Sequence, residues 1–206
     1  MKKHLRAFLA MVALFSILLI GCISKIKYPS YYTLSLPSAA DPPAKESALP
    51  SITVREFRAP GYLRQGPIVY RTSPGQVGFY EYHRWAVDPR QSITNAVTER
   101  LRASGSFAAV KIYDGRADAD YILSGRLEKL DEVDYQGGVR VEVELSAQVI
   151  DLHTGKTVWT NSAFEMAKVD RRNIPAIVAE MSSMTDRAIE RLLKSLSLAT
   201  VATVHQ

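Results

Sequence analysis

The chain has 206 residues, one cysteine and a formal net charge of +5 at pH 7. A single cysteine excludes an internal disulfide and a metal site built from several cysteines. Lys2, Lys3 and Arg6 carry three of the five net charges, and the +2 that remains is too little to indicate nucleic-acid binding, which needs many phosphate contacts.

The first residues predict a secretory signal of the bacterial lipoprotein type. The basic start is followed by an apolar run at residues 7–20, broken only by Ser16 and shorter than the roughly 20 residues that a membrane-spanning helix needs. The run ends in Leu-Ile-Gly-Cys at residues 19–22, the lipobox pattern. We therefore expect a signal peptide at residues 1–21 and lipid on Cys22. The alternative is a short membrane anchor that is never cut.

Two or three acyl chains on Cys22 would make release from the membrane negligible, because burial of each CH₂ is worth about 0.8 kcal/mol. Ile23 follows the cysteine. In the best-known sorting system an aspartate at that position retains a lipoprotein in the inner membrane. Ile23 therefore predicts the periplasmic face of the outer membrane.

Four segments in the first part of the chain combine β-forming residues with flanking turn residues. They predict strands at residues 28–36, 52–57, 67–72 and 78–85. Residues 37–50 are rich in Pro, Ala and Ser and predict a linker.

A helix is predicted to begin at Pro89, because Asp88 is a favoured cap and proline is favoured at the first helical position. Gly105 marks its end. Strands are predicted after it at residues 107–113 and 120–130.

Residues 139–149 give the clearest pattern in the chain. Every odd position carries an apolar residue and every even position a polar one, which indicates a strand with one buried and one polar face. A turn at residues 153–155 leads to a partner strand at residues 158–166, in which Trp159 points away from the side of Val158, Phe164 and Met166.

A long amphipathic helix is predicted at about residues 174–198. The expected fold is α+β, a mainly antiparallel sheet with two principal helices packed on one face. Residues 22–50 would form the lipidated N-terminus, a short strand and a linker. Residues 51–200 would form a single periplasmic domain, followed by a tail at residues 201–206.

The sequence offers little chemistry for catalysis. His83 is the one histidine outside the signal, a turn and the tail, and it has no metal-ligand or triad spacing. The neighbouring carboxylates at residues 118 and 120, and at 131, 132 and 134, fit strand ends and turns better than a catalytic pair. No phosphate-binding loop occurs. We expect no enzyme activity, no metal and no cofactor.

Two further features have alternative interpretations. Met181 and Met184 either line a lipid groove or pack in the core, and the core is favoured. Arg171 and Arg172, before the last helix, either contact phospholipid headgroups or an acidic partner, or form a solvated turn, which is favoured.

Several segments together resemble the ABC-type transport auxiliary lipoproteins, the PqiC-like family. They are YYTL (31–34), GPIVYRTSP (66–74), FYEYHRWA (79–86), SGSFAAV (104–110), ADYILSGRLEKLDE (119–132) and DLHTGKTVWTNSAFE (151–165). Each segment alone is weakly specific, but they cover nearly the whole chain after Cys22 in the family's order.

The resemblance implies an accessory, non-enzymatic role beside MCE-domain proteins, which carry phospholipid or other hydrophobic molecules between two membranes, often with a permease and an ATPase. The family is also compatible with a homo-oligomer. The distinctive cluster within residues 79–86 is a candidate docking or lipid-contact surface, although its side chains could simply pack the sheet. Its members are Tyr80, Tyr82, His83, Arg84 and Trp85.

Two other functions remain open. Small α+β lipoproteins also scaffold or activate cell-wall synthesis or outer-membrane assembly. A tethered hydrolase is disfavoured, because the sequence shows no nucleophile with a matching base.

Overall fold

The computed structural model describes residues 27–38, 49–116, 118–135, 137–170 and 173–204, with side chains described up to residue 199. The expected signal peptide, Cys22, Arg171 and Arg172 lie outside the described residues. Within the described part of the chain, no helix combines the length and the hydropathy needed to cross a membrane.

The sheet is built around its longest strand, β6 (Tyr121–Asp134). One edge of β6 pairs antiparallel with β7 (Val139–Asp151), and β7 pairs antiparallel with β8 (Thr157–Lys168). These three long strands follow one another in the chain, so short turns are enough to connect them. They form the part of the sheet that the sequence pattern predicts best.

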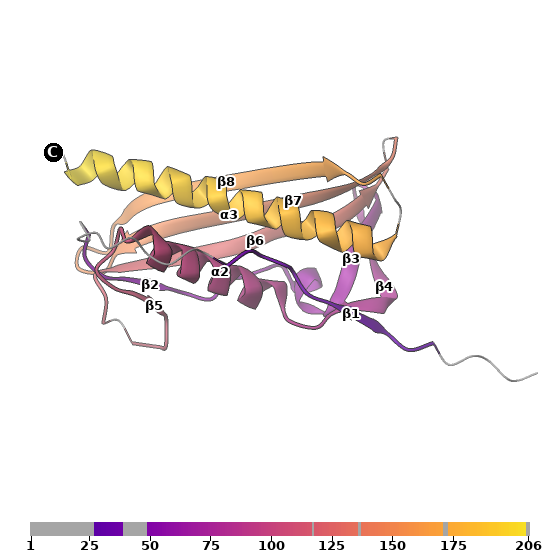
Figure 1. Cartoon of the computed structure of the whole chain (residues 1–206), viewed down its shortest axis with the longest axis horizontal. Coiled ribbons are helices and arrows are strands. Elements are labelled where there is room, and N and C mark those ends of the chain that lie inside the picture. The colour runs from indigo at the N-terminus through magenta and orange to yellow at the C-terminus, as the bar shows by residue number, and fades with distance from the viewer. Residues whose placement is uncertain (1–26, 39–48, 117, 136, 171–172, 205–206) are drawn as a thin grey trace, which may run out of the picture.

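The other edge of β6 is shared by two short strands, so the sheet forks (Figure 1). β2 (Ile52–Val54) runs parallel to the start of β6 and carries β5 (Val110–Ile112) on its far side. β3 (Pro67–Ser73) runs parallel to the end of β6, pairs antiparallel with β4 (Gln76–Trp85), and β4 pairs parallel with β1 (Ser30–Tyr32).

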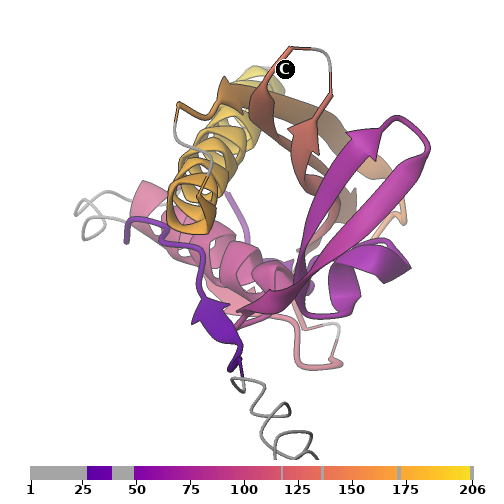
Figure 2. The ribbon, with the colours of Figure 1, turned by 90° about the vertical axis from the view of Figure 1, so that its right-hand side faces the viewer.

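The two helices, α2 (Pro89–Ser104) and α3 (Ile174–Val204), pack on one face of this sheet. The view along the long axis shows the sheet curving around them (Figure 2). As predicted, Asp88 caps α2, accepting the backbone N–H of Arg90 at 2.9 Å, and Gly105 ends it in the left-handed conformation with φ of 61°. The α+β fold with two principal helices on one face is therefore confirmed.

The core lies between the inner face of the sheet and α3. Val141, Val143 and Leu145 on β7 are fully buried, which confirms the alternation predicted for this strand. Met181 and Met184 on α3 are also fully buried in the same core, so they pack the protein interior and do not line an open groove.

Several elements differ in length from the sequence-based expectation. β1, β2 and β5 each keep only three residues, because each is a strand only where a parallel neighbour supplies hydrogen bonds. β6 continues past residue 130 to Asp134, because β3 pairs with residues 131–133. α3 continues past residue 198 to Val204.

A glycine on β6 determines how the chain leaves β2. The ring of Phe57 lies on Gly125, and a Cβ atom at Gly125 would come within 2.2 Å of its Cζ atom. Phe57 is therefore fully buried, while its neighbours Glu56 and Arg58 are exposed. Backbone hydrogen bonds of Arg55 and Arg58 with β6 hold this segment beside the strand.

Gly125→Ala should destabilise the fold by about 1–3 kcal/mol, because the added methyl group overlaps a buried ring that has no room to move. The free energy of unfolding from urea denaturation measures the effect. Gly75→Ala is the matched control, since nothing lies within 4 Å of its Cβ position. Equal stabilities for the two variants would contradict this packing.

Candidate docking surfaces

The cluster of aromatic and basic residues in β4 lies on an irregular part of that strand. Val69 of β3 opposes Phe79, whereas Pro67 opposes Arg84, so β4 carries extra residues between these two pairs. This bulge brings the rings of Tyr80 and His83 together, with centroids 5.7 Å apart in an edge-on arrangement. The sequence pattern of a regular strand could not predict that contact.

Three members of the cluster serve the fold. The Tyr80 hydroxyl donates to the buried carboxylate of Glu132 at 2.6 Å. Nδ1 of His83 lies 3.1 Å from the Tyr32 hydroxyl, which ties β4 to β1. Trp85 is buried in the core. These side chains therefore hold the strand in place.

Tyr82 and Arg84 are only partly buried and belong to a more exposed group at the β1–β4 edge. Nζ of Lys27 lies 4.7 Å from the centre of the Tyr82 ring, and Tyr31 opposes Arg84 in the parallel β1–β4 pair. Tyr28 is 78% exposed and Tyr31 61% exposed. We call Lys27, Tyr28, Tyr31, Tyr82 and Arg84 the tyrosine patch.

Sequence reasoning found Tyr82 and Arg84 but missed Tyr28 and Tyr31 as surface groups. Their sequence pattern predicts a strand, but β-propensity does not tell which side of an edge strand faces solvent. Their close spacing around residues 28–32 was the signal available in the sequence.

A second exposed surface follows β8. Among the strands that the structure describes, β8 pairs with β7 alone, so its outer edge offers a long row of backbone groups. Val158, Phe164 and Met166 are 53%, 44% and 54% exposed. Phe164 and Met166 lie on the face opposite Glu165, whereas Val158 stands at a register irregularity near the end of α3. We call these three residues and the free side of the strand the β8 edge.

Apart from a register irregularity around Val158, the β8 edge has little of the usual protection of natural edge strands. Proteins blunt a free edge by making it short, by charging it or by covering it. Here the exposed face of a 12-residue strand carries large apolar groups, and Lys129 of β6 lies 5.3 Å from the centre of the Phe164 ring. The inner side is different, since Glu165 is buried there and forms an ion pair with Arg191 of α3 at 2.7 Å. Such an edge is suited to a partner protein.

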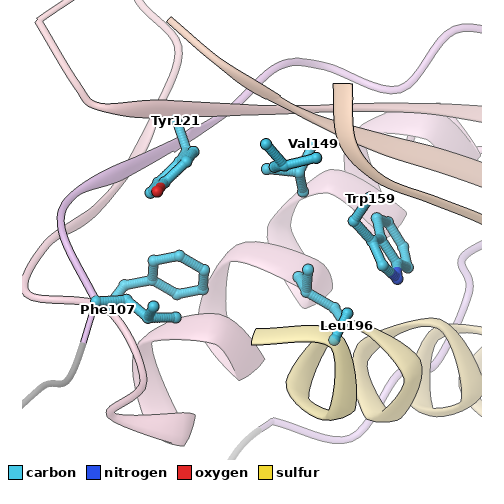
Figure 3. A pocket seen from close by; sticks show the side chains of 8 residues that line it. Phe107, Tyr121, Val149, Trp159 and Leu196 are labelled. Carbon is cyan, nitrogen blue, oxygen red and sulfur yellow. The ribbon is translucent and has the colours of Figure 1, made fainter. Parts of the chain in front are cut away.

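A small apolar cavity lies where the last described turns of α3 cover the ends of the long strands (Figure 3). Its volume is about 80 Å³. The labelled side chains of Phe107, between α2 and β5, Trp159 of β8 and Leu196 of α3 surround it. Its lining consists of Leu49, Phe107, Tyr121, Val149, Val158, Trp159, Leu196 and Ala199. These groups offer apolar contact and no acid–base chemistry.

The neighbouring carboxylates Asp131 and Glu132 are both buried, but they point to opposite faces of β6, as successive strand residues do. Asp131 accepts from Arg71 at 2.5 Å, and burial raises the pKa of Asp131 although Arg71 opposes that shift. Glu132 contacts Tyr80 instead. The two carboxylates therefore do not form an acid–base pair.

Ser51, Asp120 and His153 meet at one corner of the sheet, which sequence reasoning did not predict. Ser51 donates its hydroxyl to Asp120 at 2.7 Å, and Nε2 of His153 lies 3.0 Å from the other oxygen of Asp120. In a hydrolase triad the histidine stands between the serine and the acid. Here the acid stands between the other two, so His153 is not placed to activate Ser51.

The described residues thus form a sheet with two helices on one face and two exposed surfaces, the tyrosine patch and the β8 edge. Among them, no group of three or more His, Cys, Asp or Glu side chains is placed to hold a metal ion.

The sequence profile of the ABC-type transport auxiliary lipoprotein component family matches residues 32–192. This match spans most of the chain, and the protein belongs to that family. The resemblance found in the sequence segments is confirmed.

Two solved structures are similar in fold. Protein XCC0632 from Xanthomonas campestris, of family DUF330, has 16% identity and a TM-score of 0.73, over 86% of this chain and 100% of that chain. An uncharacterized protein has 16% identity and a TM-score of 0.63, over 82% of this chain and 99% of that chain. At such identities the similarity shows the fold alone. A search of curated proteins found no match.

The hydrogen bond between Asp120 and His153 can be tested through its effect on the pKa values of the two side chains. The hydrogen bond between them raises the pKa of His153, and the same bond, with those from Ser51, lowers the pKa of Asp120 to about 2. Because the pKa of folded His153 is raised, its contribution to stability is complete below its ordinary pKa of about 6.5 and is lost as pH rises through the folded-state pKa.

Asp120→Asn should lower the pKa of His153 toward its ordinary value, measured by NMR titration of the imidazole protons. Asp118→Asn is the control, because that carboxylate pairs with Lys111 at 3.3 Å. An unchanged His153 titration in Asp120→Asn would show that the hydrogen bond does not form.

Proposed function

We propose that the protein is a lipid-anchored, non-enzymatic docking component of an ABC/MCE-type transport system. The system would move phospholipid or other hydrophobic molecules between the inner and outer membranes. The partners would be an MCE-domain protein and its associated permease and ATPase. Membership of the transport auxiliary lipoprotein family supports the general role.

The observation that carries the docking role is the β8 edge. A long free edge with Val158, Phe164 and Met166 exposed can accept a strand from a partner, which gives main-chain hydrogen bonds along the edge and apolar contacts on its outer face. Aromatic residues and methionine are enriched in interfaces of this kind. The cavity and the polar corner offer no comparable surface.

The predicted docking residues of β4 are retained in part. Tyr82 and Arg84 are accessible and can contact a partner or lipid. Tyr80, His83 and Trp85 would act indirectly, because they hold β4 in its bulged form. Contact by Arg171 and Arg172 remains a prediction from the sequence.

The anchor is the second part of the proposal. The lipobox ending in Cys22, and the family's description as a lipoprotein component, support attachment through acyl chains. Ile23 supports the periplasmic face of the outer membrane. From that face the docking surfaces would meet the far end of an MCE assembly.

Replacing Phe164 and Met166 together by serine should reduce recovery of an MCE-domain protein at least tenfold, because truncating residues at the centre of an interface costs about 1.4 kcal/mol or more. Co-purification of the tagged full chain from solubilised membranes measures this. Ile112→Ser, which alters an apolar side chain of similar exposure on β5, is the matched control.

If the double variant recovers the MCE-domain protein fully, at unchanged thermal stability, the β8 edge is not the docking surface. Recovery of a cell-wall synthase or an outer-membrane assembly factor in place of the MCE-domain protein would favour the scaffolding alternative.

Cys22→Ala should abolish incorporation of labelled palmitate and leave the signal peptide uncut, because lipid transfer to the thiol precedes cleavage. Mass spectrometry of the purified chain measures both changes. Ser24→Ala, two residues away, should behave as the unchanged protein does. A Cys22→Ala protein that is processed and functions as a free soluble protein would contradict the anchor.

A further inference from the structure

The tyrosine patch points to a partner different from that of the β8 edge. We propose that the patch lies in the headgroup region of the membrane that holds the acyl chains of Cys22. The inference rests on the proposed anchor and names the bilayer surface as the partner of these residues.

The length of chain between the anchor and the patch limits where the patch can be. Lys27 follows Cys22 by five residues. Even a fully extended chain of that length spans at most about 18 Å, at roughly 3.6 Å per residue. A lipid-bound Cys22 therefore keeps Lys27 within about 18 Å and Tyr28 within about 22 Å of the anchoring cysteine, so both stay near the bilayer surface.

The chemistry of the patch fits that location. Tyrosine has an apolar ring and a polar hydroxyl, and it is enriched where membranes meet water. At this edge the side chains of Tyr28 and Tyr31 are 78% and 61% exposed. Such exposure is costly in water and favourable in an interface that accepts both parts of the ring.

The patch also holds two cations, Lys27 and Arg84, of which Arg84 donates from Nη2 to the backbone oxygen of Gln65 at 3.4 Å. Arg84 opposes Tyr31, and Tyr82 precedes Arg84 by two residues, so the period of the strand places the three on one face. Lys27 lies over the Tyr82 ring. Glu81 is the acidic neighbour, and its hydrogen bond with the Tyr82 hydroxyl raises the pKa of Tyr82. With two cations and one carboxylate, the patch and its acidic neighbour carry a net charge of +1.

The position of the patch in the molecule sets the orientation of the whole protein. β1 lies at one end of the long axis, and the C-terminal end of α3 lies at the other (Figure 1). Contact of the patch with lipid therefore directs the C-terminal end of α3, with the apolar cavity, away from the bilayer.

The test uses the full lipidated chain with Tyr31→Trp, reconstituted in phosphatidylcholine vesicles that contain brominated acyl chains near the headgroup. Subtracting the emission of the unsubstituted protein removes the contribution of Trp85 and Trp159. The added fluorescence should shift to the blue and fall at least twofold on bromination. Tyr113→Trp, beside β5 at the other end of the molecule, should show neither change.

Three outcomes would overturn the inference. Emission unaffected by bromine in protein that floats with the vesicles removes the patch from the bilayer but leaves the anchor intact. A blue shift without quenching places another copy of the chain on the patch. Protein that does not float with the vesicles lacks the anchor, and the inference fails with it.

Discussion

The packing of α3 against the three long strands is the constraint on which the rest of the structure depends. The inner faces of β6, β7 and β8 are apolar, and α3 covers them with a stripe that includes Met181, Met184 and Ile189, all fully buried. The ion pair of Arg100 with Asp186 joins α2 to α3, so the two helices act as one layer. Because the inner face is filled, contacts with other molecules are left to the outer face, the edges and the ends of the sheet.

This division of surfaces leaves the outer face and the edges of the sheet accessible to other molecules. Charged groups inside the fold are used for structure: Arg71 with Asp131 connects β3 to β6, and Glu165 with Arg191 connects β8 to α3. The groups left exposed at the edges include large apolar and aromatic side chains, among them Tyr31, Phe164 and Met166. A lipid-anchored domain of this kind would have two contacts at once, one with its membrane and one with a partner protein. The proposed anchor would supply a high local concentration, so each contact could be weak.

Local sequence signals predicted the elements whose neighbours are close in the chain. The alternation at residues 139–149 identified β7, and Asp88 with Gly105 identified both ends of α2. The short parallel pairings were not predictable, because β2 meets β6 across a long stretch of chain and three residues carry no period. The same reason hid the fork of the sheet and the contact of Ser51 with Asp120 and His153. In β4 the residue types indicate a distinctive cluster, but the sequence does not tell which side chains pack and which stay accessible. The bulge determines this, because it brings Tyr80 and His83 together while Tyr82 stays accessible.

Cross-linking in living cells tests the central claim most directly, because it requires no purification of a weak complex. A photoreactive amino acid at position 164 should form a cross-link to an MCE-domain protein, while the same group at position 112 should not. The account is contradicted if position 164 forms no cross-link to any envelope protein while the chain remains folded and active in its membrane.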